Sequence, residues 1–181
     1  DVRLSSLTRL NVGTIFDCRH CLPSIRDLLA HPTIIEVQNL NPDQACLLIM
    51  FLLSAIVEEI RISRTYGKKL QHVTVIEEAH NIVGRMEQAQ PSSEFADPKA
   101  YAAEHIVRML AEIRALGEGI IIADQLPSAV AASVVKNTGT KLAHRLVSLV
   151  DREDLGGAML LQGEQMEEIA RLEPGQAYYF T

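Results

Sequence analysis

The stretch His72–His80 reads HVTVIEEAH, an apolar run rich in β-branched residues that is followed at once by two acids. The run His72–Ile76 is largely apolar on both faces, which is typical of a central strand in a parallel sheet. Glu77 and Glu78 then follow a buried strand, where two carboxylates are costly unless a cation or a polar partner meets them. One carboxylate could hold the water shell of a nucleotide-bound Mg²⁺, and the other could orient an attacking water. The alternative is a helix N-terminus whose dipole the two acids complement.

A second strand also ends in polar residues. Gly119–Ala123 (GIIIA) is followed by Asp124 and Gln125. The amide of Gln125 can donate to a phosphate oxygen and accept from a neighbour, so it could sense whether a γ-phosphate is present. The alternative is an ordinary turn in which Asp124 or Ser128 acts as a cap. Because ligands bind beyond the carboxyl ends of parallel strands, both strand ends are candidate parts of a site.

Strand and helix signals alternate along the rest of the chain, which predicts βαβ units, an α/β fold and a mainly parallel sheet flanked by helices. We expect residues 1–181 to form a single α/β domain in which the polar stretch 84–98, with its two prolines, is a mobile loop or insert. The first long helix should begin after a cap at Asn41 and run to about Tyr66. The other expected elements are an apolar run at Val12–Phe16, strands at Thr33–Val37, Leu142–Leu149 and Gln176–Phe180, and helices at Tyr101–Leu116, Ser128–Val135, Arg152–Met159 and Glu164–Leu172.

The composition excludes several classes of protein. With 48% hydrophobic and 22% charged residues, the 181-residue chain is neither disordered nor collagen-like. An aromatic content of 4% argues against base-stacking binders of single-stranded nucleic acid, and a net charge of −6 argues against a broad basic surface. The most apolar stretch, Ala45–Val57, is too short to span a membrane. Three cysteines and the lack of a signal peptide predict a cytoplasmic location.

Four segments together resemble the HerA/FtsK superfamily of hexameric P-loop motor ATPases, and in particular its HerA-like branch and related conjugation ATPases. They are VTVIEEAH, the helix and strand AEIRALGEG–IIIADQLPS, NTGTKLAHR at Asn137–Arg145, and the closing LEPGQAYYF. The resemblance covers Thr14–Phe180 and implies a RecA-like P-loop NTPase core. It implies that VTVIEE is the Walker B strand, with Glu77 as the metal-associated acid and Glu78 as the water-polarising glutamate.

The same resemblance implies a role for residues after the second strand. Gln125 falls at the position of the family's sensor glutamine. Arg145 falls in the arginine-bearing segment that such rings present at subunit interfaces, and Arg114 is the competing candidate for an arginine that acts in trans. The resemblance further implies ATP and Mg²⁺ as cofactors, a hexameric homo-oligomer, DNA as a partner, and a possible partner nuclease.

The sequence departs from the family's pattern at two points. Glu77 stands where the family usually has Asp, so contact with the metal could run through water, as Mg²⁺ often prefers. No G-x-x-x-x-G-K-[ST] motif, which cradles the phosphates, occurs in the sequence. We therefore expect the P-loop before Asp1 and read the chain as the C-terminal part of a motor domain, inactive alone. The alternatives are a non-catalytic ATPase-like scaffold and a conjugation or secretion ATPase that moves protein.

Overall fold

The fold is built around two parallel strands, β1 (His72–Glu77) and β2 (Glu118–Ala123), which pair in register from His72 opposite Glu118 to Glu77 opposite Ala123. The structure is a computed structural model that describes residue 13 and residues 23–67, 69–85 and 98–181. Both strands were predicted, and each begins or ends within one residue of the expected bound. The predicted run Val12–Phe16 and most of the predicted 84–98 loop lie outside the described residues.

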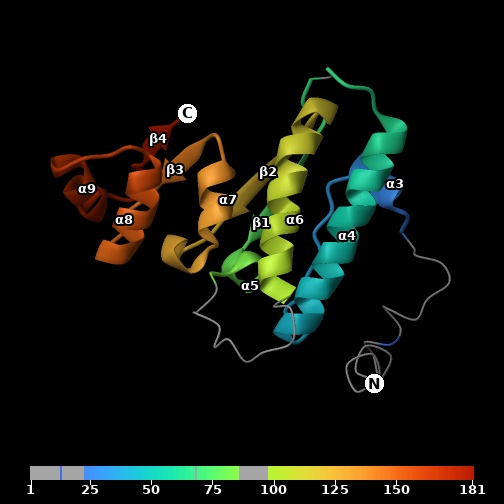
Figure 1. The fold of residues 1–181 in the computed structure, drawn as a ribbon, viewed down its shortest axis with the longest axis horizontal. Helices are drawn as coiled ribbons and strands as arrows, with labels where there is room; N and C mark the ends of the chain where they lie inside the picture. Colours follow the sequence, from blue (N-terminus) through green and yellow to red (C-terminus); the bar gives the residue numbers. More distant parts are fainter. Residues whose placement is uncertain (1–12, 14–22, 68, 86–97) are drawn as a thin grey trace.

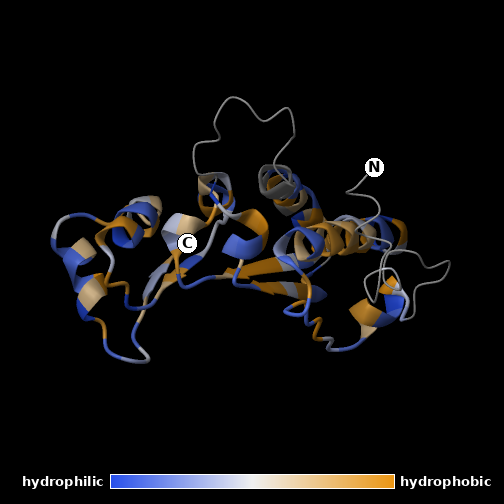
Figure 2. Ribbon diagram, turned by 90° about the horizontal axis from the view of Figure 1, so that it is seen from below, coloured by the Kyte–Doolittle hydropathy of each residue, from blue (hydrophilic) through white to orange (hydrophobic). Residues whose placement is uncertain are grey.

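Helices cover one face of this pair of strands (Figures 1 and 2). They are α4 (Pro42–Ser63), α5 (His80–Val83), α6 (Pro98–Ile113) and α7 (Ala132–Asn137). The opposite face carries Val75 and Ile121, which remain 55% and 52% exposed. Apolar side chains from the helices, from β1 and from the segment before α7 form the main core, namely Cys46, Leu53, Val57, Ile76, Ala79, Ile82, Val83, Ile106, Met109, Ile113, Val130 and Val134.

The longest helix, α4, begins as the sequence predicts. The side chain of Asn41 accepts a hydrogen bond of 2.9 Å from the backbone N–H of Gln44, and Pro42 occupies the first turn. The helix ends at Ser63, slightly before the predicted end at Tyr66. None of the helices in the described part of the chain has the length and apolarity needed to cross a membrane.

The predicted strand Thr33–Val37 is wrong. This segment is extended but pairs with no described strand, and Ile34 is 90% exposed. It lies across an open groove of about 1090 Å³ from β1, and a β-branched segment forms a strand only where a partner completes its hydrogen bonds. A short helix just before it, α3 (Ile25–Ala30), was not predicted, although Ser24 and Asp27 form a capping box at its start.

The C-terminal part contains a second pair of strands, β3 (Lys141–Ala143) and β4 (Tyr178–Phe180), which is antiparallel. The predicted strand Leu142–Leu149 is wrong beyond Ala143. The hydroxyl oxygen of Ser148 accepts from the backbone N–H of Asp151 and caps α8 (Leu149–Ala158), so the helix begins where the strand was expected to end. The remaining helical segments are α9 (Glu164–Glu168) and the 3₁₀ turns η1 (Arg114–Leu116), η2 (Pro127–Ala129) and η3 (Ile169–Arg171).

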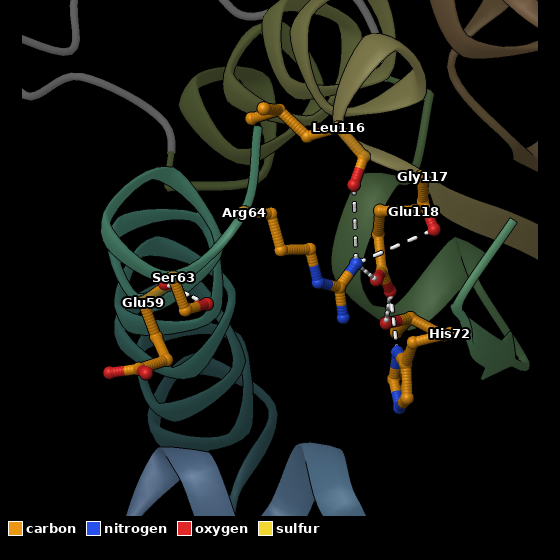
Figure 3. Close-up of polar contacts among 8 residues, drawn as sticks. Glu59, Ser63, Arg64, His72, Leu116, Gly117 and Glu118 are labelled. Carbon is orange, nitrogen blue, oxygen red and sulfur yellow. Dashed lines mark hydrogen bonds and ion pairs between the residues drawn. The ribbon is translucent and has the colours of Figure 1, made fainter. Parts of the chain in front are cut away.

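A buried carboxylate fastens α4 to the start of both parallel strands (Figure 3). The side chain of Glu118 is fully buried and accepts from His72 Nδ1 at 2.6 Å and from Thr74 Oγ1 at 2.9 Å. Arg64, just after α4, places its Nη1 3.1 Å from the other carboxylate oxygen, and 3.4 Å from the carbonyl oxygen of Gly117. This charged cluster holds the end of the sheet that is opposite to the acids after β1.

Candidate active site

The carboxyl ends of β1 and β2 bring the two predicted polar segments together. Because Glu77 is opposite Ala123 in the parallel register, Glu78 and Asp124 are the first residues beyond the paired strands. Gln125 then reaches across and donates a hydrogen bond of 3.1 Å from Nε2 to Glu78 Oε1. Two of the three residues predicted to be catalytic therefore touch each other in the structure.

Glu78 has an unusual backbone conformation, with φ of 49°. Residues other than glycine and asparagine rarely adopt this left-handed backbone conformation. Holding such a residue there costs about 1–3 kcal/mol, and residues of this kind cluster at functional sites. Its side chain is half exposed, so one carboxylate is held at the strand end with access to solvent. The strain and the exposure together make Glu78 the candidate centre of the site.

Glu77 stands on the other side of the chain from the buried Ile76, as strand alternation requires, and it is exposed. Within the described part of the chain its carboxylate has no polar partner, and no group of three or more metal-binding side chains occurs. Mg²⁺ commonly takes one or two protein carboxylates and completes its shell with water and phosphate oxygens. One exposed carboxylate is a donor that Mg²⁺ accepts, and the role of Glu77 in holding the ion stays a prediction.

Two further residues belong to this strand end. The Asp124 carboxylate, whose side chain is 6% exposed, accepts from the backbone N–H of His80 at 2.7 Å and from that of Leu126 at 2.8 Å. The His80 ring places Nδ1 3.0 Å from Asp124 Oδ2 and 3.6 Å from Glu78 Oε2. The sequence identified Asp124 only as a possible cap, and its contact with Leu126 is such a turn. The bond to His80 joins residues that are 44 positions apart, so no local sequence pattern predicts it.

Arg145 lies apart from these residues. It is exposed, two residues beyond β3, and makes no ion pair with any described residue. Asp151, the local partner that could have neutralised it, instead accepts a 3.0 Å hydrogen bond from the backbone N–H of Ser128. Burial by itself raises the pKa of Asp151, but the hydrogen bonds with Ser128 and Ser148 together outweigh it and hold that pKa below its usual value. The guanidinium of Arg145 is therefore free to meet a group outside the described chain.

Arg114, the competing arginine, lies at the other end of the sheet. It opens η1, four residues before β2 begins, whereas Glu78 and Gln125 follow the ends of β1 and β2. A six-residue strand spans about 20 Å, so Arg114 cannot reach these residues within the same chain.

Comparison with known proteins shows the fold. No protein family and no curated protein matches the sequence. Among solved structures, the chain is similar to the genome packaging NTPase B204 from Sulfolobus turreted icosahedral virus 2. In complex with ATP-gammaS, that protein matches at 13% identity over 88% of this chain and 67% of its own, with a TM-score of 0.55. The chain therefore has a P-loop NTPase fold.

Two further structures of the same viral NTPase agree. The complex with sulfate is 14% identical over 98% of this chain and 80% of its own, and the complex with AMP is 15% identical over 86% and 65%. Both have a TM-score of 0.55. The predicted α/β fold is thus confirmed.

Proposed function

We propose that the chain is part of an ATP-driven DNA translocase or helicase of the HerA type, which hydrolyses ATP in an oligomeric ring. The observation that carries the proposal is the contact between Glu78 and Gln125 across the ends of two adjacent parallel strands. The fold supports it, because the similar viral protein is a genome packaging NTPase solved with ATP-gammaS and with AMP. A cytoplasmic location accords with this role and stays a prediction.

In this proposal Glu78 orients the water that attacks the γ-phosphate and accepts its proton as the bond from the water oxygen to the γ-phosphorus forms and the bond from that phosphorus to the bridging oxygen of ADP breaks. Gln125, which now donates to Glu78, would turn its amide to the γ-phosphate or to that water when nucleotide is bound. Glu77 would hold Mg²⁺ through water, and the ion, when bound, neutralises charge on the phosphates. Catalysis by such a site consists mainly of positioning and charge stabilisation.

The proposal is tested by Glu78→Gln in the intact protein, with Glu153→Gln as the control at an exposed acid outside the site. Glu78→Gln keeps the shape of the side chain and removes the charge that orients the water. We expect it to abolish turnover while ATP binding persists, and we expect the control to match wild type. If Glu78→Gln hydrolysed ATP in a single turnover at a rate within about threefold of wild type, the role of Glu78 would be refuted. Each tenfold in rate corresponds to about 1.4 kcal/mol of activation free energy, so Glu78 would then lower the barrier by less than that amount.

Arg145 is proposed to act on the γ-phosphate of a neighbouring subunit, where a guanidinium can raise the rate by several orders of magnitude. Its exposure and lack of a described partner support this role. Mixed rings of Arg145→Ala and Glu78→Gln subunits, each inactive alone, should regain part of the activity at sites that combine an intact glutamate with an intact arginine. No recovery in rings shown to be mixed would refute the role in trans and favour Arg114.

Two other functions make different predictions in the same assays. A non-catalytic scaffold would show no hydrolysis even by the wild-type intact protein. A conjugation or secretion ATPase would hydrolyse ATP, but protein would stimulate it in place of DNA. We expect hydrolysis that double-stranded DNA accelerates. A partner nuclease, if present, would be found by co-purification.

A further inference from the structure

We propose that Asp124 and His80 are positioning residues that hold the Glu78 carboxylate in the orientation needed for water activation. This inference rests on the proposed function of the same site. It assigns a role to a carboxylate that the sequence predicted only as a cap, and to a histidine whose bonding partner lies 44 residues away.

Asp124 joins the turns that follow the two strands. One of its oxygens accepts from the backbone N–H of His80, which follows β1, and the other accepts from the backbone N–H of Leu126, which follows β2. A carboxylate has two acceptor oxygens and can serve both turns at once, whereas a hydroxyl or an amide offers one. Since the Asp124 side chain is only 6% exposed, water competes little for these bonds. The turn that carries Glu78 is thereby fixed relative to the turn that carries Gln125.

The His80 ring completes the support. Its Nδ1 lies within hydrogen-bonding distance of both Asp124 oxygens, at 3.0 and 3.2 Å. A carboxylate only accepts, so Nδ1 carries the hydrogen in this contact. The same nitrogen lies 3.6 Å from Glu78 Oε2, while Gln125 donates to Oε1 on the opposite side. Gln125 therefore donates the hydrogen bond that Glu78 accepts, while the imidazole lies beside the other carboxylate oxygen without a hydrogen bond to it and is itself oriented by Asp124.

This support compensates for the strained backbone of Glu78. With φ of 49°, the residue would relax toward a common conformation if the turn were free to move, and its carboxylate would shift. A displacement of about 1 Å at a reacting group can cost about 10²-fold in rate. We therefore expect loss of the support to lower kcat about 100-fold while the KM for ATP changes less than about twofold, because neither residue is proposed to contact the nucleotide.

Histidine variants give the sharper test, since they leave both backbone bonds to Asp124 in place. His80→Ala removes the ring, whereas His80→Asn restores an N–H donor near the position of Nδ1. In the intact protein we expect His80→Ala to lower kcat about 30- to 100-fold and His80→Asn to recover most of that loss. His105→Ala serves as the control, because this half-buried histidine bonds to Ser54 on α4, away from the site. Asp124→Asn should behave like His80→Ala.

Two outcomes would overturn the proposal: kcat within about threefold of wild type for both His80→Ala and Asp124→Asn, or a His80→Asn variant that is no better than His80→Ala. ¹⁵N NMR of the His80 ring in nucleotide-free protein gives a test that needs no hydrolysis. We expect a protonated Nδ1 whose signal moves in Asp124→Asn, and an unprotonated Nδ1 would refute the contact. If the wild-type protein proves unable to hydrolyse ATP, the proposed function fails, and the NMR measurement still decides whether the pair exists.

Discussion

The buried carboxylate of Glu118 should contribute far more to stability than a comparable ion pair on the surface. Its side chain is fully buried and has three partners, Arg64, His72 and Thr74, at 2.6 to 3.1 Å. Glu118→Ala leaves the guanidinium of Arg64, which is only 11% exposed, without its counter-ion. Removing one partner of a buried pair typically costs 3–5 kcal/mol, so we expect a loss of about 4 kcal/mol in the free energy of unfolding.

The matched control is Glu112→Ala. Glu112 also pairs with an arginine, Arg61, through two short contacts of 2.8 and 2.6 Å, but the side chains are 38% and 46% exposed. Water screens this pair and replaces the lost bonds, so we expect a loss of at most about 1 kcal/mol.

Urea unfolding of both variants measures the difference, provided that the slope of the transition stays constant. A third variant separates charge from shape, because Glu118→Gln keeps the volume and one acceptor oxygen and should fall between Glu118→Ala and wild type. The reasoning would be refuted if Glu118→Ala cost no more than Glu112→Ala. It would also be refuted if Glu118→Gln were as stable as wild type, since the negative charge would then contribute nothing.

Three further predictions concern the strand end, the C-terminal part and the nucleotide. The Glu78→Gly variant should be about 1 kcal/mol more stable than Glu78→Ala, because glycine accepts φ of 49° without strain. This difference corresponds to a Tm that is about 2–4 °C higher, and equal melting temperatures would contradict the prediction. Burial raises the pKa of Asp151, but the bonds with Ser128 and Ser148 outweigh burial and keep that pKa below its ordinary value of 3.8, so the contribution of Asp151 to stability is present above about pH 4 and is lost as the pH falls further. In a plot of the urea midpoint against pH, Asp151→Asn should flatten the acid part of the curve, and an unchanged acid part would contradict this. The 181-residue chain alone should bind ATP weakly or not at all in calorimetric titration with Mg²⁺, because its sequence contains no phosphate cradle, and submicromolar binding would refute that expectation.

The predictions that failed share a physical cause. Thr33–Val37 has the β-branched composition of a strand, and the residues after Ala143 include the apolar Leu146, Val147 and Leu149, but a strand needs a hydrogen-bonding partner that composition does not supply. In the first case the segment lies across a groove from β1, and in the second the Ser148 cap begins a helix. The missing partner outweighed the strand propensity of Thr33–Val37, and the local hydrogen bond of Ser148 outweighed that of the residues after Ala143.

The predictions that succeeded depended on short-range rules. The Asn41 cap and the positions of β1 and β2 need no knowledge of distant residues, because capping is local and a run of β-branched residues is itself a strand signal; the burial of both faces that the apolar runs predicted is wrong for the described residues, since Val75 and Ile121 are exposed. The meeting of Glu78 and Gln125 was also predictable, since parallel strands end at the same edge of a sheet.

By itself, then, the sequence determined the fold class, the two parallel strands and the acids that follow the first of them. Only the tertiary structure decided which groups support those acids. The bond between His80 and Asp124 and the contacts of the buried Glu118 join residues that are 44 or more positions apart, and the left-handed backbone of Glu78 follows from no residue type in its own segment. Such contacts follow from how the strands and helices pack, and packing is a property of the whole chain that no local pattern carries.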